Sequence, residues 1–147
     1  MKADDISIPI FQQLRDGRKS LKKIADELHV SENTVRSKIH KLTEQGTMEI
    51  SAIVNPEKIA GHSMVIIGVK LATMDLVSKG EEFSKLNGVV SVSVVTGRFD
   101  LIVMVLLKQD FGLLEFFTEE VKKIDQVQSV ESFVVYKSYN LTVPYVF

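Results

Sequence analysis

Two short helical patterns, separated by only two residues, are the feature that most constrains this chain. Apolar residues recur at helical spacing in both patterns: Leu21, Ile24, Ala25 and Leu28 in the first, and Val35, Ile39 and Leu42 in the second. The link between them, His29 and Val30, is too short for anything but a sharp corner. Ser20 and Ser31 stand where each helix would begin, where a serine side chain accepts a hydrogen bond from a first-turn backbone N–H. The sequence therefore predicts two helices packed across a tight turn, the second ending at Gly46.

The outward face of the second helix is polar. Its side chains are small and hydrogen-bonding near the start and mostly basic further along: Asn33, Thr34, Arg36, Ser37, Lys38, His40 and Lys41. A helix that enters the major groove of DNA needs this arrangement, with small polar groups for base edges and cations for phosphates. The pattern predicts a helix-turn-helix, with Ser31 at the entering end and Lys22 and Lys23 of the preceding helix as further phosphate contacts.

A helical hairpin whose polar face is merely solvated is the alternative. The charge distribution favours DNA, because residues 1–46 hold nine Lys and Arg against seven Asp and Glu, a net charge of +2. Residues 47–147 hold nine against twelve, a net charge of −3, which together give the −1 of the whole chain. Positive charge gathered at one end can present a basic face to DNA although the chain is near neutral.

A first helix is predicted over residues 5–16, with Ile6, Ile10, Phe11 and Leu14 on one side. Pro9 fits only in or near the first turn, so this helix begins between Asp5 and Ile8. The three helices together form a predicted DNA-binding domain, residues 1–46. His29 lies in the corner, where a positive φ is often needed, and we expect a structural role for it.

The rest of the chain changes character. Residues 47–61 are predicted to be a linker, with a strand over 47–54 that Asn55 and Pro56 end. In residues 62–147, strands are predicted at 64–72, 89–96, 100–107 and 127–139, and helices at about 76–86 and 110–124. This order is that of the ferredoxin-like fold. The whole chain is thus predicted to be α+β, with an N-terminal three-helix helix-turn-helix domain and a C-terminal ferredoxin-like βαββαβ domain.

Two of the predicted strands, residues 64–69 and 101–107, are apolar on both faces. The two helices of a ferredoxin-like domain cover only one face of its sheet, so something else must cover the other. A second subunit would do so, and the hydrophobic content of 45% agrees with self-association. Strand alternation places either Val103 and Val105 or Ile102 and Met104 on that face. The alternative is that the N-terminal unit folds back over it.

The composition excludes several kinds of site. There is no cysteine, which excludes disulfides, thiolate nucleophiles and cysteine zinc sites. The three histidines, His29, His40 and His62, have no ligand spacing, so no catalytic residue, metal or cofactor is predicted. No apolar run approaches the roughly 20 residues of a membrane span, and residues 1–9 lack the apolar region of a signal peptide. The sequence therefore predicts a soluble, cytoplasmic protein.

Three short motifs connect these parts to a known family. Asp16-Gly17-Arg18 follows the first helix, Asn55-Pro56-Glu57-Lys58-Ile59-Ala60-Gly61 ends the linker, and Thr96-Gly97-Arg98-Phe99-Asp100 joins two predicted strands. With the domain order, they resemble the DGR, D-P-x-x-L-G and T-G-x-[YF]-D motifs of the Lrp/AsnC (leucine-responsive, feast/famine) transcription regulators over nearly the whole chain. The sequence departs from the family pattern at Ser7, Pro9 and His29, where members often have charged residues and a glycine.

The resemblance implies dimers formed through the sheet faces, further assembly in even numbers such as tetramers or octamers, and an amino-acid effector bound between dimers. The effector would lie near the turn formed by Thr96, Gly97, Arg98, Phe99 and Asp100. There Gly97 lets backbone N–H groups face a carboxylate, Asp100 pairs with an α-ammonium group, and Arg98 holds a carboxylate or a neighbouring subunit. By the same resemblance Ser129, Glu131 and Ser132 lie near this turn of an adjacent dimer. The alternative is that Asp100 only caps the turn and Arg98 is solvated.

The predicted function is a DNA-binding transcriptional regulator that responds to a small-molecule effector, an amino acid. One alternative is an architectural protein that binds DNA without any ligand. Another is an enzyme, because siroheme decarboxylases share this two-part architecture and use histidines and arginines along the second strand and its turn. Residues 89–95 read VVSVSVV, without histidine, so we predict that the protein is not an enzyme.

Overall fold

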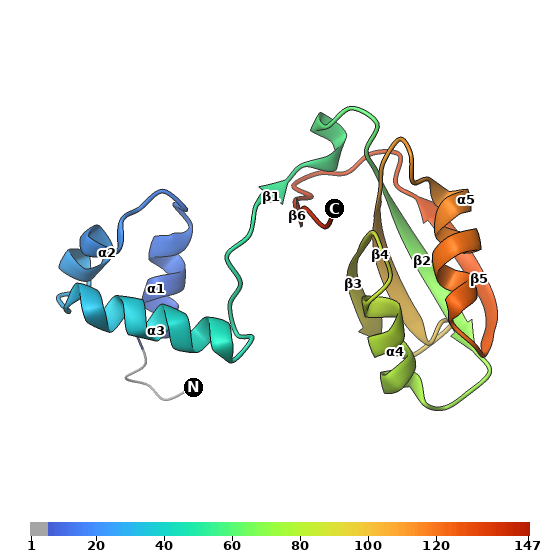
Figure 1. Cartoon of the computed structure of the whole chain (residues 1–147), viewed down its shortest axis with the longest axis horizontal. Coiled ribbons are helices and arrows are strands. Elements are labelled where there is room, and N and C mark those ends of the chain that lie inside the picture. The colour runs from blue at the N-terminus through green and yellow to red at the C-terminus, as the bar shows by residue number, and fades with distance from the viewer. Residues whose placement is uncertain (1–5) are drawn as a thin grey trace. The chain divides into compact units, whose positions relative to one another are not determined.

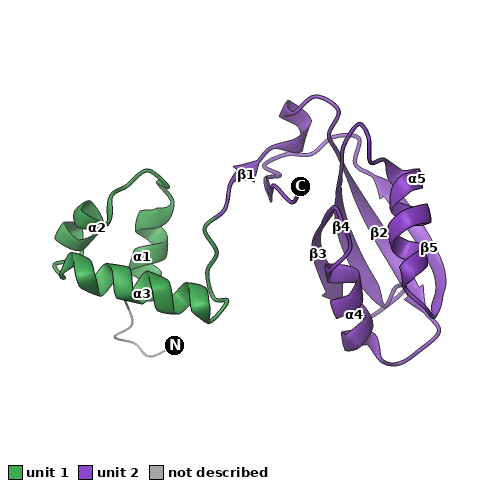
Figure 2. Cartoon of the chain, in the orientation of Figure 1, with its two compact units in different colours: residues 1–50 green, residues 51–147 purple. Residues whose placement is uncertain are grey.

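The computed structural model describes residues 6–147 and divides the chain into two compact units, residues 1–50 and residues 51–147 (Figure 2). Asp5, one limit of the predicted start of the first helix, lies outside the described residues. The helix itself, α1, spans Ser7–Leu14. Within residues 6–147, no helix is long and apolar enough to cross a membrane.

Unit 1 contains three helices, α1, α2 (Leu21–Glu27) and α3 (Glu32–Glu44) (Figure 1). Its core is the set of apolar side chains expected from the helical spacing: Ile10, Ile24, Ala25 and Val35, with Ile6, Leu14, Leu21, Leu28, Val30 and Ile39 packed against them. Ser20 and Ser31 cap α2 and α3, as predicted, each accepting a hydrogen bond from a backbone N–H three residues on. His29 in the corner has φ 54°, which confirms the expected positive φ.

Residues 51–61 belong to unit 2, although we expected them in a separate linker. The strand predicted over 47–54 is reduced to β1 (Ile53–Val54), which pairs with β6 (Val143–Pro144) in the C-terminal segment. A strand extends only as far as its partner, and β6 offers two residues. A 3₁₀ turn follows at Pro56–Lys58, capped by the Asn55 side chain, which accepts a hydrogen bond from the Glu57 N–H.

The rest of unit 2 is a four-stranded antiparallel sheet with helices, and the predicted ferredoxin-like fold is confirmed. Its elements are β2 (Ser63–Leu71), α4 (Leu76–Ser84), β3 (Val89–Val94), β4 (Leu101–Leu107), α5 (Leu113–Glu115) and β5 (Val127–Val134). The strands lie in the order β3-β4-β2-β5. The helix predicted over 110–124 begins later and continues beyond α5 as a π-helical turn, Phe116–Glu120, and a 3₁₀ turn, Val121–Lys123.

One face of the sheet packs against the helices (Figure 1). There Val65, Ile67 and Val69 of β2 and Leu101, Val103 and Val105 of β4 form a core with Phe83 and Phe116 of the helical segments. Val103 and Val105 are fully buried on this side, so they are not the pair that a second subunit would cover. Strand alternation instead directs Ile66, Ile102 and Met104 to the opposite face, where they are half-buried.

The chain covers part of this opposite face itself. Met64, Leu106 and Val143 form a buried cluster there, and Val54, Leu141, Val146 and Phe147 pack against it. We expected a second subunit or the N-terminal unit to cover this face. That expectation is wrong for the part of the face next to β1 and β6. The C-terminal segment, with Leu141, Val143, Val146 and Phe147, provides that cover.

Candidate nucleic-acid interface and effector site

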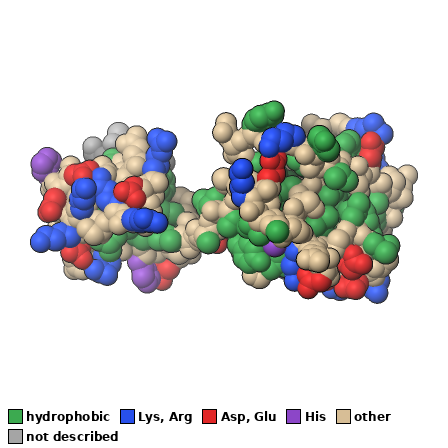
Figure 3. Space-filling model, turned by 90° about the horizontal axis from the view of Figure 1, so that it is seen from above, with side chains coloured by type: hydrophobic (Ala, Val, Ile, Leu, Met, Phe, Trp, Pro, Cys, Tyr) green, Lys and Arg blue, Asp and Glu red, His purple; other side chains and the backbone are tan. Residues whose placement is uncertain are grey.

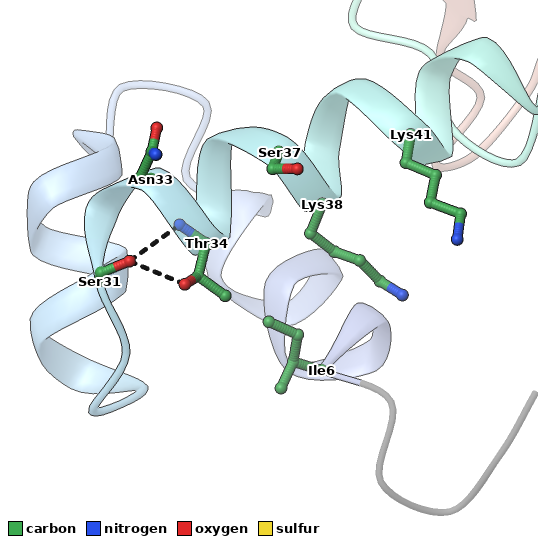
Figure 4. A pocket seen from close by; sticks show the side chains of 7 residues that line it. All are labelled: Ile6, Ser31, Asn33, Thr34, Ser37, Lys38 and Lys41. Atoms are coloured by element: carbon green, nitrogen blue, oxygen red, sulfur yellow. Dashed lines mark hydrogen bonds between the residues drawn. The ribbon is translucent and has the colours of Figure 1, made fainter.

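Six of the predicted DNA-contacting residues line one open depression of about 470 Å³ (Figure 4). Its lining is polar or basic, with one apolar side chain from the segment before α1: Ser31, Asn33, Thr34, Ser37, Lys38, Lys41 and Ile6. Figure 4 shows these side chains along one side of the helix, from the polar residues of its first turn to the lysines further along. Ile6 was not among the predicted site residues, because its apolar side chain indicates only a core position.

Around the first turn of α3, some polar side chains hydrogen-bond within the protein and others do not. Ser31 Oγ accepts a hydrogen bond from the Thr34 N–H at 3.1 Å and shares a second, 2.7 Å, with Thr34 Oγ1. These two side chains therefore fix the helix start. Within residues 6–147, the side chains of Asn33 and Ser37 make no hydrogen bond, and both are exposed. Their side chains can therefore hydrogen-bond to base edges in the major groove.

The remaining predicted cations differ in their surroundings. Arg36 pairs with Glu32 at 2.7 Å and His40 with Glu44 at 3.1 Å, both one turn apart on α3 and both exposed. Exposed ion pairs of this kind contribute little energy, so a phosphate can replace the carboxylate at Arg36. Lys22 and Lys23 are exposed on α2. Figure 3 shows Lys and Arg side chains over unit 1, interspersed with Asp and Glu.

The predicted effector turn, residues 96–100, folds over the sheet face opposite the helices. The Phe99 ring lies directly on Gly68 of β2, where a Cβ atom would be only 2.7 Å from three ring carbons. The same ring meets Phe133 of β5 edge-on, with ring centroids 6.1 Å apart. Gly68 is thus required by this close approach.

Arg98 and Glu131 form an exposed ion pair beside these rings, with 2.6 Å between Nη2 and a carboxylate oxygen. The Arg98 guanidinium also lies over the Phe99 ring, 5.3 Å from its centroid. Glu131 therefore meets the turn of its own chain, whereas we had expected it near the turn of an adjacent dimer.

Asp100 is held by its own chain. One carboxylate oxygen accepts a hydrogen bond from the Leu71 N–H and the other from Lys70 Nζ, both at 2.8 Å. The backbone N–H of Leu71 and the Lys70 ammonium lower the pKa of Asp100. This arrangement matches the alternative in which Asp100 is structural, and it does not favour an ammonium ligand at that carboxylate. Lys70 was missed, although it is the one charged residue in β2.

The other predicted effector residues do not all gather at the turn. Ser129 and Glu131 pair with Lys70 and Gly68 of β2, so they share the sheet face under Phe99. Ser132 pairs with Ile67, a core residue on the helix side, so strand alternation separates it from the turn. Thr96 and Gly97 are exposed, and Gly97 has φ 119°, a conformation that favours glycine.

With both sites described, the chain can be compared with known proteins. A family model described as the Lrp/AsnC ligand binding domain matches residues 64–144, more than half of the chain. The chain belongs to the Lrp/AsnC family. A model described as an HTH domain matches residues 8–61, which contain α2, α3 and all of α1 except its first residue.

Named relatives agree with this assignment. An uncharacterized HTH-type transcriptional regulator of Pyrococcus horikoshii, PH0140, is 29% identical over 92% of this chain and 87% of its own. Among solved structures, AsnC of E. coli has a TM-score of 0.71 at 21% identity, covering 96% of this chain and 97% of its own. The regulator NMB0573 of Neisseria meningitidis, solved as a complex with L-methionine, has a TM-score of 0.71 at 20% identity, covering 96% and 94%. The protein is therefore a DNA-binding transcriptional regulator of this family, and not an enzyme.

Proposed function

We propose that this Lrp/AsnC regulator binds double-stranded DNA through α3, and that an amino acid bound beside the turn 96–100 changes its DNA affinity. One observation carries the effector part: the exposed pair of Arg98 and Glu131, whose side chains are 75% and 40% exposed. An amino-acid zwitterion has a carboxylate for the guanidinium and an ammonium for the carboxylate. The L-methionine complex of the N. meningitidis regulator, which shares this fold, supports the ligand class.

The proposed pocket has an apolar side next to the ion pair. The rings of Phe99 and Phe133 meet edge-on over the sheet, with centroids 6.1 Å apart. An apolar amino-acid side chain would gain free energy by burying its surface there. We therefore expect an effector with an apolar side chain.

On DNA, we propose that Asn33 and Ser37 contact base edges and that Lys38 and Lys41 contact phosphates. Thr34 presents its methyl group on the same face, while Ser31 fixes the start of the helix. Arg36, His40, Lys22 and Lys23 would add phosphate contacts on either side of α3.

We also propose that the protein is a homodimer, which assembles further into tetramers or octamers. Ile66, Ile102 and Met104 are half-buried on the sheet face opposite the helices. A second copy packed on this face would remove them from water. Two DNA-binding units in one dimer predict two half-sites separated by about one helical turn or a multiple of it.

The effector hypothesis is tested by a thermal-shift screen against the standard amino acids, followed by calorimetry on wild type, Arg98→Ala and Glu131→Gln. We expect one apolar amino acid to raise the melting temperature, and both variants to bind it at least about tenfold more weakly, since each removes a charged hydrogen-bond partner. The alternative is an architectural protein without a ligand, in which the turn is purely structural. The hydrogen bonds that Lys70 and Leu71 donate to Asp100 favour that alternative. No response to any amino acid would support that alternative.

A further inference from the structure

Unit 2 contains a second cavity, of about 400 Å³, at the start of β2. It is separate from the proposed effector site, because the turn 96–100 lies over Gly68 and bonds Lys70 and Leu71 further along that strand. Its walls come from the 3₁₀ turn, the start of β2 and the segment after β5: Pro56, Glu57, His62, Ser63, Met64, Val135, Tyr136, Lys137, Ser138 and Leu141. The volume falls in the range typical of sites for small molecules.

Two of these walls are tied together by Glu57. Its carboxylate accepts hydrogen bonds from the Ser138 N–H at 2.6 Å, the Ser138 hydroxyl at 2.7 Å and Lys137 Nζ at 2.5 Å. These partners are about eighty residues away in the sequence, so the bonds hold two distant segments together as walls of the cavity. A cavity with fixed walls binds a ligand without first having to order them.

His62 lines the cavity and has a buried ring nitrogen without a hydrogen-bond partner in the described part of the chain. Its Nδ1 lies 3.2 Å from the Ala60 carbonyl oxygen, which can only accept, so Nδ1 carries the hydrogen. In the neutral ring Nε2 is then an acceptor. This atom is buried and has no hydrogen-bond partner among residues 6–147. The Tyr145 ring, 5.9 Å away between centroids, contacts the imidazole without satisfying Nε2. Buried polar atoms of this kind normally have a partner.

We propose that this cavity binds a small amphipathic molecule, an amine or an alcohol, whose N–H or O–H donates a hydrogen bond to His62 Nε2 when the imidazole turns this buried nitrogen toward the cavity. The apolar part of the molecule packs against Met64, Val135 and Leu141. An anionic ligand is disfavoured, because the Glu57 carboxylate lines the cavity and already occupies Lys137, the cation beside it. This site does not depend on the proposed effector site, and a ligand here joins the Pro56–Lys58 turn to the segment after β5.

The direct test is NMR of the histidine side chains in the full-length protein, with benzylamine, benzyl alcohol and benzoate as probes of similar size. A donor bound at Nε2 shifts the ¹⁵N resonance of that nitrogen away from the value of a bare acceptor. We expect benzylamine and benzyl alcohol at millimolar concentration to shift His62 Nε2, while His29 and His40 do not move. Benzoate, which has no hydrogen to donate at neutral pH, leaves the resonance unchanged.

The matched variants are His62→Asn and His29→Asn. Asparagine at position 62 can still donate to the Ala60 carbonyl through its amide but has no acceptor at the Nε2 position, so the affinity for benzylamine should fall about fivefold to tenfold. Asparagine tolerates the positive φ of position 29, and that variant should bind the probe as wild type does. If His62 Nε2 in the wild-type protein did not respond to either donor, or responded equally to benzoate, the proposal would be wrong.

Discussion

The close approach of Phe99 to Gly68 allows a quantitative prediction about the effector turn. In Gly68→Ala, the new methyl carbon would lie 2.7 Å from three carbons of the Phe99 ring, Cγ among them. Ordinary contact begins at 3.4 Å, so the ring must withdraw by about 0.7 Å. Because Cγ lies next to Cβ, the ring cannot retreat by bending at its far end, and the backbone of the turn must move with it.

The expected cost follows from two opposing terms. Overpacking typically costs about 1–3 kcal/mol of unfolding free energy, while replacing glycine by alanine inside a strand returns about 0.5–1 kcal/mol of backbone entropy. The difference between these terms is about 0–2.5 kcal/mol, and their mid-range values predict that Gly68→Ala destabilises unit 2 by about 1 kcal/mol. The measurement is urea unfolding followed by far-UV circular dichroism, at one fixed protein concentration because self-association would add to the apparent stability.

A matched control lies in α4 of the same unit. At Gly80 an added methyl group would be 3.5 Å from its nearest neighbour, Val94, so Gly80→Ala should stabilise the protein by about 0.5–1 kcal/mol. The cause is tested by repeating Gly68→Ala in a Phe99→Ala background, where the cost should disappear. A cost that persisted without the Phe99 ring, or a Gly68→Ala variant stabilised as much as Gly80→Ala, would refute the steric effect of the Phe99 ring.

Three further predictions follow from other parts of the structure. The hydrogen bond from Lys137 is the main cause that lowers the pKa of Glu57 from 4.5 to about 2. Glu57→Gln should therefore reduce the free energy of unfolding at neutral pH, and this loss should vanish as the pH falls from about 4.5 to about 2. Thermal unfolding measured across this pH range would show it. Lys41→Ala should weaken binding to all DNA sequences and reduce the slope of log K against log salt by about one unit, whereas Asn33→Ala should change the sequence preference and leave that slope unchanged. Ile102→Asp should give a folded monomer in sedimentation experiments, whereas Val103→Asp, on the fully buried helix side, should unfold the protein. A folded, dimeric Ile102→Asp variant would exclude this sheet face as the interface.

Much of the architecture could be predicted because it depends on local patterns. The helical stripes that include Ile10, Ile24 and Val35 became the core of unit 1, and the corner residue His29 has the expected positive φ. The strand and helix order of unit 2 follows from apolar spacing in the same way. Each of these features is decided by residues within a few positions of one another.

The sequence did not reveal several contacts between residues far apart in it. β1 forms because residue 53 pairs with residue 144, and the sequence around residue 53 does not indicate that partner. The hydrogen bond from Lys70 to Asp100, thirty residues later, could not be read from the sequence either. Ser132 was grouped with Glu131 by proximity in the sequence, although adjacent strand residues point to opposite faces.

The central claim is that an amino acid at Arg98 and Glu131 controls DNA binding by α3. Its most direct test is fluorescence anisotropy with a DNA duplex selected by the protein from a random library, with and without the amino acid that gives the largest thermal shift. We expect the amino acid to change the Kd of wild type for DNA at least about fivefold. Arg98→Ala should bind the same DNA without responding, and Lys41→Ala should bind more weakly yet keep the fold-change. A full response in Arg98→Ala would contradict the account.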